Sequence, residues 1–391
     1  MANFKTKLQG DILIAVFYFF VYAGAASYLA FYNPFIEDEL NFNGVQIGII
    51  NGIYQGIMLV AVVTWGILAD KKGLRFSLVI SLISTAILVF FLQYFHQFNY
   101  LVLYMFLFAF FYHPNPPLID TLAINHARNY ESSAFGKYRL WGSLGWGTAT
   151  LVVGSLISEA HISLIFYASA IAFFILFILV ATFVKTDPDR VKGSLINLKD
   201  FKVIFANRRL ALFFLIIFVY GISITPLNYY INLYFKDIGA SNTVVGYAFT
   251  VQAFTEIPFF FYADKIVKRF GARNAILVTI AVTVVRMILY SMASDPLLAL
   301  PLGALHGFTL SIFLVAVVNY VHELVPAHWR ATAQSLIWAF HFGAGVTVGN
   351  VLIGFLKDTT SMRDIMFWMA MAVVVVGFFF FLFFQKDKRN K

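Results

Sequence analysis

Windows of about 20 predominantly apolar residues recur along the whole chain, separated by short breaks that contain charges, glycine or proline. A helix of about 20 apolar residues is long enough to cross the hydrocarbon core of a bilayer. Inside that core a helix satisfies all of its own backbone hydrogen bonds. The pattern predicts an all-α membrane protein with twelve transmembrane helices. The predicted spans are 11–33, 45–69, 75–95, 98–125, 134–157, 162–184, 210–235, 243–263, 273–293, 297–323, 330–356 and 364–385.

The composition excludes several classes of protein. With 61% hydrophobic and 12% charged residues among 391, the chain has too little polar surface for a soluble protein. The net charge of +9 is spread over short loops, which argues against a nucleic-acid partner. Cysteine is absent and no zinc, calcium or haem spacing occurs, so we expect no metal and no cofactor. No nucleophile, base and orienting group stand at a recognisable spacing, so we expect no catalytic residues and no enzyme activity.

The distribution of basic residues predicts the orientation. Most of the 28 lysines and arginines lie near the two chain ends and in alternate loops, whereas the remaining loops carry Lys236, Lys357 and Arg363. By the positive-inside rule, both termini and the loop 185–209 are cytoplasmic. The first apolar segment has no small-residue cleavage site, so we interpret it as a membrane helix and not as a removed signal peptide.

The longest break, 185–209, lies at the middle of the chain. It predicts a division into an N-terminal six-helix bundle, 1–184, and a C-terminal six-helix bundle, 210–391. Alternating apolar and charged residues over 195–205 predict a short helix on the cytoplasmic face. Two pseudo-symmetric bundles with buried polar groups at mid-depth are typical of a transporter that rocks one bundle against the other.

A short pattern is repeated after the second and the eighth predicted spans: an acid, then bases, a glycine and a further base. We interpret it as a tight turn in which glycine permits the bend and the carboxylate bonds a neighbouring helix end. Ordinary basic loops would explain the bases but not the repeated acid and glycine. The residues of this turn motif are Asp70, Gly73 and Arg75 in the first copy and Asp264 and Gly271 in the second.

Asp120 and Arg139 stand inside otherwise apolar segments on either side of a short polar hairpin. A charge at a helix centre costs roughly 2.5 to 3.5 kcal/mol, so such residues are typically paired, inward-facing and functional. Each lies about 11 Å from the hairpin, so the two can meet. Trp146 follows Arg139 by two turns on the same face, and Gly142 and Gly145 allow a neighbouring helix to approach closely. The three side chains predict a site for a polar ligand with a flat apolar face, such as a sugar; the alternative is an ion pair that only locks two helices together.

A second group of ionisable residues lies in the C-terminal half, where helix rise places Glu256, Arg286 and His306 near the middle of the bilayer. A desolvated carboxyl near an arginine can exchange its proton when small movements change its surroundings. This arrangement indicates a proton-coupling site, although a lone histidine on an apolar face is often only a packed core residue. His113 and His341 have no acid and arginine predicted nearby, and we interpret them as hydrogen-bonding or packing residues.

These patterns resemble the major facilitator superfamily over essentially the whole chain. Within it they resemble the lactose permease-like oligosaccharide:proton symporters and the phenylpropionate permease-like group. The stretch 135–146 is similar to the permease's fifth helix, which implies that Arg139 binds sugar hydroxyls and that Trp146 stacks on the sugar ring. Asp120 stands where the family has a glutamate that partners the arginine. The repeated turn motif resembles the family's cytoplasmic gating motif, which implies a gating role for its residues.

The resemblance extends to the second half, with departures. Arg286 and His306 keep the permease's spacing of twenty residues, and 305–308 is similar to the start of its tenth helix. Thr309 stands where the permease has its proton-accepting glutamate, and Glu256 lies about one turn beyond the permease's eighth-helix glutamate. Glu256 is therefore the acid that we expect to couple protons, assisted by Arg286 and His306.

We expect a secondary active transporter in a bacterial cytoplasmic (inner) membrane. It would take up a small polar solute, such as a sugar or nucleoside, together with protons by alternating access. Its expected partners are that solute, protons and the lipid bilayer, and we expect a monomer. Two alternatives stay open: proton-coupled uptake of an aromatic or other organic acid, which could bind Arg139 directly, and a non-transporting membrane sensor or lipid flippase, in which the buried charges would be structural.

Overall fold

The computed structural model describes residues 2–129, 135–185, 207–326 and 329–384, and the regular structure within these ranges is helical throughout. The short helix predicted within 195–205 lies outside the described residues. The segments are α1 (Ala2–Asp38), α2 (Gly44–Lys72), α3 (Leu74–Phe91), η1 (Leu92–Tyr94), α4 (Phe98–Tyr112), α5 (Asn115–Asn129), α6 (Phe135–Glu159), α7 (Leu164–Phe183), α9 (Arg208–Tyr229), α10 (Ile231–Asp237), α11 (Asn242–Phe270), α12 (Ala272–Met292), α13 (Pro296–Ala299), η2 (Leu300–Gly303), α14 (Ala304–Leu324), α15 (Arg330–Ile337), η4 (Trp338–Gly345), α16 (Val346–Lys357) and α17 (Met362–Phe383).

The described residues contain 11 helices that are long and apolar enough to cross a bilayer, and these correspond to all but one of the predicted spans. The exception is the fourth span, 98–125, in which α4 ends at Tyr112 and a separate helix, α5, follows. Pro114, Pro116 and Pro117 cause the division, because proline has no backbone N–H and its ring clashes with the preceding turn. The two segments together occupy the place of the fourth span.

Asn115 compensates for this break. Its side chain is fully buried, and its amide nitrogen donates to the carbonyl oxygens of Phe111 at 3.1 Å and Tyr112 at 3.0 Å. In an unbroken helix the Tyr112 carbonyl would accept from residue 116, which is a proline. The same amide also donates to the Thr85 hydroxyl at 2.9 Å, and its oxygen accepts from Ser81 at 2.7 Å. The freed backbone group is thus satisfied inside the protein, as the bilayer interior requires.

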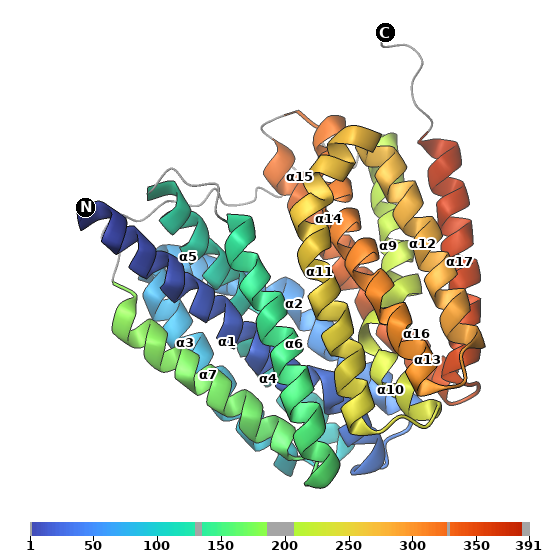
Figure 1. The fold of residues 1–391 in the computed structure, drawn as a ribbon, viewed down its shortest axis with the longest axis horizontal. Helices are drawn as coiled ribbons and strands as arrows, with labels where there is room; N and C mark the ends of the chain where they lie inside the picture. Colours follow the sequence, from blue (N-terminus) through green and yellow to red (C-terminus); the bar gives the residue numbers. More distant parts are fainter. Residues whose placement is uncertain (1, 130–134, 186–206, 327–328, 385–391) are drawn as a thin grey trace.

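Figure 1 shows two groups of helices, α1 to α7 and α9 to α17, side by side. Helix α1 begins and α17 ends on the same face of the molecule, which we call the termini face. The face at which α1 ends and α2 begins is called the opposite face. Towards the opposite face the two groups converge, and towards the termini face they diverge (Figure 1).

Two helix pairs join the halves: α6 packs against α11, and α2 packs against α16. A Cβ atom on Gly246 of α11 would lie 2.5 Å from the Thr150 carbonyl oxygen, and one on Gly48 of α2 would lie 2.6 Å from the Asn350 carbonyl oxygen. Only glycine permits backbones to approach this closely. The hydroxyls of Thr150 and Thr250 add a hydrogen bond of 3.0 Å across the first pair.

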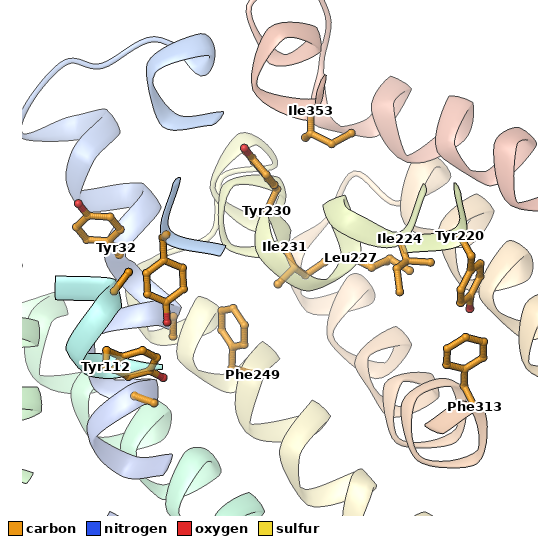
Figure 2. Packing of buried hydrophobic residues seen from close by; sticks show 14 of the residues in the cluster. Tyr32, Tyr112, Tyr220, Ile224, Leu227, Tyr230, Ile231, Phe249, Phe313 and Ile353 are labelled. Atoms are coloured by element: carbon orange, nitrogen blue, oxygen red, sulfur yellow. The ribbon is translucent and has the colours of Figure 1, made fainter. Parts of the chain in front are cut away.

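Each half has its own buried aromatic core. In the first half, Tyr28 meets Phe108 edge to face, with ring centroids 5.3 Å apart. In the second half, Tyr220 of α9 and Phe313 of α14 face each other with centroids 4.8 Å apart (Figure 2). Aromatic pairs at such separations add to the stability gained from burial alone. Each half is therefore packed internally around buried aromatic rings.

Charged residues join the halves at the opposite face. Glu37 at the end of α1 accepts from Lys236 of α10 and from Lys357 of α16, each at 2.8 Å, and Lys236 also contacts Asp38. Burial alone would lower the pKa of Lys236, but its hydrogen bonds with Asp38 and Glu37 raise the pKa above the ordinary value. Asp358 accepts from the first two backbone N–H groups of α2, at 2.5 and 3.0 Å. We call Glu37, Asp38, Lys236 and Lys357 the opposite-face latch.

Replacing Glu37 by glutamine should loosen this latch, because one carboxylate faces both lysines. Each charge-assisted hydrogen bond contributes about 1.5–3 kcal/mol, so the population open at the opposite face should rise at least about tenfold. Since the chain contains no cysteine, the exposed positions Gln97 and Ser294 can be changed to cysteine and spin-labelled for distance measurement by double electron–electron resonance.

The matched control is Glu39→Gln. Glu39 lies 3.7 Å from His161 in the same half, and both side chains are exposed. Its substitution should leave the distance distribution unchanged, because an exposed pair within one half does not hold the halves together. Equal distributions for Glu37→Gln and the parent protein would show that the latch does not stabilise this arrangement.

Candidate functional site

Four side chains from three helices form the first cluster. Arg139 Nη1 of α6 lies 4.0 Å from Asp120 Oδ1 of α5, so the predicted meeting of these two residues is confirmed. Tyr18 of α1 donates a hydrogen bond to Asp120, and Arg139 donates one to the hydroxyl of Tyr22, one turn further along α1. The side chains of Asp120 and Arg139 are 31% and 34% exposed, so a solute can reach both. Their role in binding stays a prediction.

Trp146 lies at the seam between the halves. Its ring is half-buried, and its centroid is 6.4 Å from that of Phe249 on α11. Between Trp146 and Arg139, a Cβ atom on Gly142 would lie 2.7 Å from the Tyr22 ring, and Gly145 faces the α1 backbone. The predicted close approach of a neighbouring helix is therefore confirmed, and that helix is α1.

His306 stands between the other two residues of the second cluster. Its Nε2 lies 3.2 Å from Glu256 Oε1, and its Nδ1 lies 3.1 Å from Arg286 Nη1. Because a guanidinium only donates, Nδ1 must accept, and in the neutral ring Nε2 carries the hydrogen and donates to the carboxylate. Arg286 is 1% exposed. His306 thus lies between the acid and the arginine, and we call this chain of contacts from Glu256 through His306 to Arg286 the relay.

Ser143 connects the two clusters. Its hydroxyl donates to Glu256 Oε2 at 3.0 Å, across the boundary between the halves. Ser143 follows Arg139 by four residues on α6, so the two lie on the same helix face. Ser143, Tyr18 and Tyr22 were not among the residues predicted from the sequence. The available signal was a polar group one turn from a site residue and two tyrosines four residues apart within the first span.

The chemistry of the two clusters suits noncovalent recognition. The guanidinium and the Tyr22 hydroxyl can donate hydrogen bonds, and the carboxylates can accept them, which suits a solute with several hydroxyl groups. Within the described residues, no group of three or more His, Cys, Asp or Glu could hold a metal ion.

The turn motif is built around a glycine of positive φ in both copies. Gly73 has φ of 99° between α2 and α3, and Gly271 has φ of 82° between α11 and α12, so the predicted glycine bend is confirmed. Asp70 and Asp264 are exposed and make no described contact with a neighbouring helix end. The arginine that follows each glycine makes that contact instead: Arg75 donates to the Ala181 carbonyl at 2.7 Å, and Arg273 donates to those of Phe381 and Phe384. The gating role stays a prediction.

Gly73→Ala should destabilise the protein by about 1–3 kcal/mol through backbone strain alone. A Cβ atom at Gly73 would meet no atom within 4 Å, so steric clash does not contribute. The matched control is Gly66→Ala inside α2, where a Cβ atom also meets nothing and the helical backbone suits alanine. Gly66→Ala should be neutral or stabilising by up to about 1 kcal/mol. Unfolding in detergent measures both, and equal changes would contradict the strain argument.

The same variant tests the gating role. Gly73→Ala should slow transport while leaving equilibrium binding nearly intact, because the motif lies at the termini face, away from both clusters. Transport rates in proteoliposomes and binding to purified protein are compared for Gly73→Ala and Gly66→Ala. Lost binding with an unchanged transport rate per bound molecule would count against a gate.

Comparison with known proteins identifies the family. The model of the MFS_1 like family matches residues 12–384. The chain belongs to this family. It is 26% identical over 380 residues to the uncharacterized transporter YwbF of Bacillus subtilis (strain 168), covering 96% of this chain and 93% of that protein. It is 26% identical over 378 residues to the maltose permease of Geobacillus stearothermophilus, covering 96% and 94%.

A solved structure shows the shared fold. The crystal structure of nucleoside transporter NupG superposes with a TM-score of 0.86 at 21% identity, covering 97% of this chain and 100% of that chain. The resemblance to the major facilitator superfamily is therefore confirmed. This MFS_1-like chain is a multi-pass membrane transporter of the major facilitator fold and not an enzyme.

Proposed function

We propose that this chain takes up a small polar solute, a sugar or nucleoside, together with protons by alternating access. The proposal rests on one observation above all, the hydrogen bond from Ser143 of α6 to Glu256 of α11. It joins the helix that carries the candidate solute ligand Arg139 to the acid that we assign to proton coupling. A movement of α6 relative to α11 changes the surroundings of both groups at once.

The solute part of the proposal rests on the first cluster. Arg139 and Asp120 present donors and acceptors side by side, and the partly exposed rings of Tyr22 on α1 and Trp146 on α6 add flat apolar surface. Sugars and nucleosides combine hydroxyl groups with an apolar face, and aromatic side chains pack on such faces. The names of the relatives agree with this class, since one is a maltose permease and another a nucleoside transporter.

Alternating access requires two arrangements of the halves. We take 1–184 and 210–391 as the moving bundles, 185–209 as the loop between them, and the termini face as cytoplasmic, in accordance with the distribution of lysine and arginine. The opposite-face latch would then close the outer side of the cytoplasmic membrane. Opening it would require the separation of Lys236 and Lys357 from Glu37.

The test begins with purified protein and a thermal-shift screen of sugars, nucleosides and aromatic acids, since a ligand of the folded state raises the unfolding temperature. Solutes that stabilise the protein are then offered to proteoliposomes under a pH gradient, a sodium gradient or neither. We expect a sugar or nucleoside to accumulate only under the pH gradient. Accumulation of an aromatic acid, or accumulation driven by sodium, would contradict the proposal.

A further inference from the structure

A small cavity, partly open on one side, lies in the second half among α9, α12, α14 and η4. Its volume is about 20 Å³, and its polar wall includes Arg286, His306 and His341. Tyr220 and Phe313, which lie next to each other in Figure 2, also line the cavity. A cavity needs roughly 10–15 Å³ of probe-occupied volume to hold one water molecule. The space therefore suits a single water and not a transported solute.

Two residues of this wall carry buried polar atoms without a hydrogen-bond partner in the described part of the chain. These atoms are Nε and Nη2 of Arg286 and Nε2 of His341, and each residue is only 1% exposed. Tyr290, whose ring lies 5.6 Å from the guanidinium carbon and whose hydroxyl interacts with the guanidinium, does not line the cavity. A guanidinium has five N–H donors, so donors remain for a ligand in the cavity beside those that face Tyr290 and His306. An unpaired buried polar group costs about 1–3 kcal/mol, and more when it is charged. Buried water molecules typically satisfy such groups.

The directions of the surrounding hydrogen bonds select the ligand. His341 Nδ1 lies 3.0 Å from the Ile217 carbonyl, so in the neutral ring Nδ1 donates and Nε2 is left as an acceptor. The guanidinium of Arg286 only donates. A ligand between them must therefore accept from arginine and donate to histidine, which water does and a halide ion does not.

Tyr220 offers a place for the second hydrogen of that water. The Thr283 hydroxyl donates to a backbone carbonyl at 2.8 Å, so the Tyr220 hydroxyl, 3.0 Å from it, must be the donor of that pair. The Tyr220 oxygen keeps its lone pairs and can accept. Arg286 thus provides donors, and His341 and Tyr220 provide acceptors. One water molecule can accept from the first and donate one hydrogen to each of the other two.

We propose that one ordered water molecule binds in this cavity and joins Arg286 to His341. His341 is then a positioning residue, which acts through the water on Arg286 and so on the relay to His306 and Glu256. The π-helix η4 carries His341, and a Cβ atom on Gly221 of α9 would lie 2.5 Å from the His341 carbonyl oxygen and 3.3 Å from its Nδ1, so α9 packs closely on this residue. π-helical turns occur frequently at functional sites. The effect on coupling rests on the proposed function, whereas the binding of water does not.

The first test needs no variant. An experimental structure of the parent protein, at a resolution that shows ordered water, should contain one water within hydrogen-bonding distance of Arg286 and of His341 Nε2. A second data set after exchange into bromide should show no anomalous signal there. A cavity without density, or one that contains bromide, would overturn the proposal whether or not the protein transports protons.

The second test measures the consequence for coupling. His341→Phe keeps an aromatic ring but removes the acceptor, so accumulation under a pH gradient should fall about tenfold or more while solute exchange continues. His341→Gln returns an acceptor and should recover part of the accumulation. The matched control is His113→Phe, because His113 is also buried and hydrogen-bonded to a backbone carbonyl, that of Tyr54 at 2.7 Å, but does not line the cavity.

Three results would overturn the positioning role: parental accumulation by His341→Phe, no recovery by His341→Gln, or an equal loss in His113→Phe. If the variants at position 341 do not fold, the density in the parent protein decides the proposal. If the parent protein transports without protons, the proposed function fails, and the density still tests the water site by itself.

Discussion

Replacing Arg139 by alanine should weaken solute binding by at least about 100-fold, because hydrogen bonds to a charged group contribute about 1.5–3 kcal/mol each and 1.4 kcal/mol is a factor of ten. Arg139→Lys should fail as well, since a point charge does not reproduce the two parallel hydrogen bonds of a guanidinium. Isothermal titration of the purified protein, with the solute found in the thermal-shift screen, measures both variants.

The control for this prediction is Arg363→Ala. Arg363 donates to the backbone carbonyls of Ser291 and Met292, outside both clusters, so its removal should leave binding unchanged. Thermal unfolding without solute shows whether each variant keeps its fold. Full binding and transport by Arg139→Lys would leave the pair with Asp120 only a structural role, that of holding α5 to α6.

Glu256→Gln should abolish proton-driven accumulation while solute exchange across the membrane continues. The amide mimics the protonated acid and keeps the geometry: its oxygen can accept from His306, and its nitrogen can donate to the hydroxyl of Ser143, which rotates freely. Accumulation in proteoliposomes under a pH gradient should fall at least about tenfold, to simple equilibration, since coupling requires a proton that binds and leaves with the conformational change.

The matched control is Glu323→Gln, an exposed acid in the last turn of α14 of the same half, which should accumulate solute as the parent does. Counterflow, in which labelled solute exchanges against unlabelled solute, separates lost coupling from lost binding. If Glu256→Gln still accumulates solute against its gradient, Glu256 is not the coupling acid. Asp120 would then have to serve both solute and proton.

The sequence was most informative where a local rule sufficed. Continuous apolar length specified the spans, because the bilayer leaves a chain few ways to satisfy its backbone. Equal depth from one hairpin was enough to predict that Asp120 meets Arg139, since both positions follow from helix rise alone. The repeated glycine predicted a turn, and Gly73 and Gly271 have the positive φ that such a turn needs.

The sequence was less informative where a contact depends on how helices rotate and pack. His306 lies between Glu256 and Arg286 because of the way in which three separate helices are rotated about their axes. The depth of each residue in the bilayer, which the sequence does give, does not specify that rotation. In the same way, Lys236 and Lys357 were used in the sequence only to predict the orientation in the membrane. In the structure both contact Glu37 across the boundary between the halves.

The division of the fourth span shows the same limit within one segment. One continuous span was predicted over 98–125, but three prolines close together interrupt it. A break in a membrane span is tolerated only if the freed carbonyls find donors. Asn115 supplies a donor to these carbonyls. Its side chain is held by hydrogen bonds with Thr85 and Ser81 of α3, which lies about 30 residues earlier in the sequence.

The sequence by itself determined the all-helical membrane fold, the pairing of Asp120 with Arg139 and the two glycine turns. Each of these depends on apolar length, helix rise or the conformation of one residue. Only the tertiary structure decided that Ser143 joins the two clusters, because a hydrogen bond between helices depends on their relative rotation and on the close packing that fixes it.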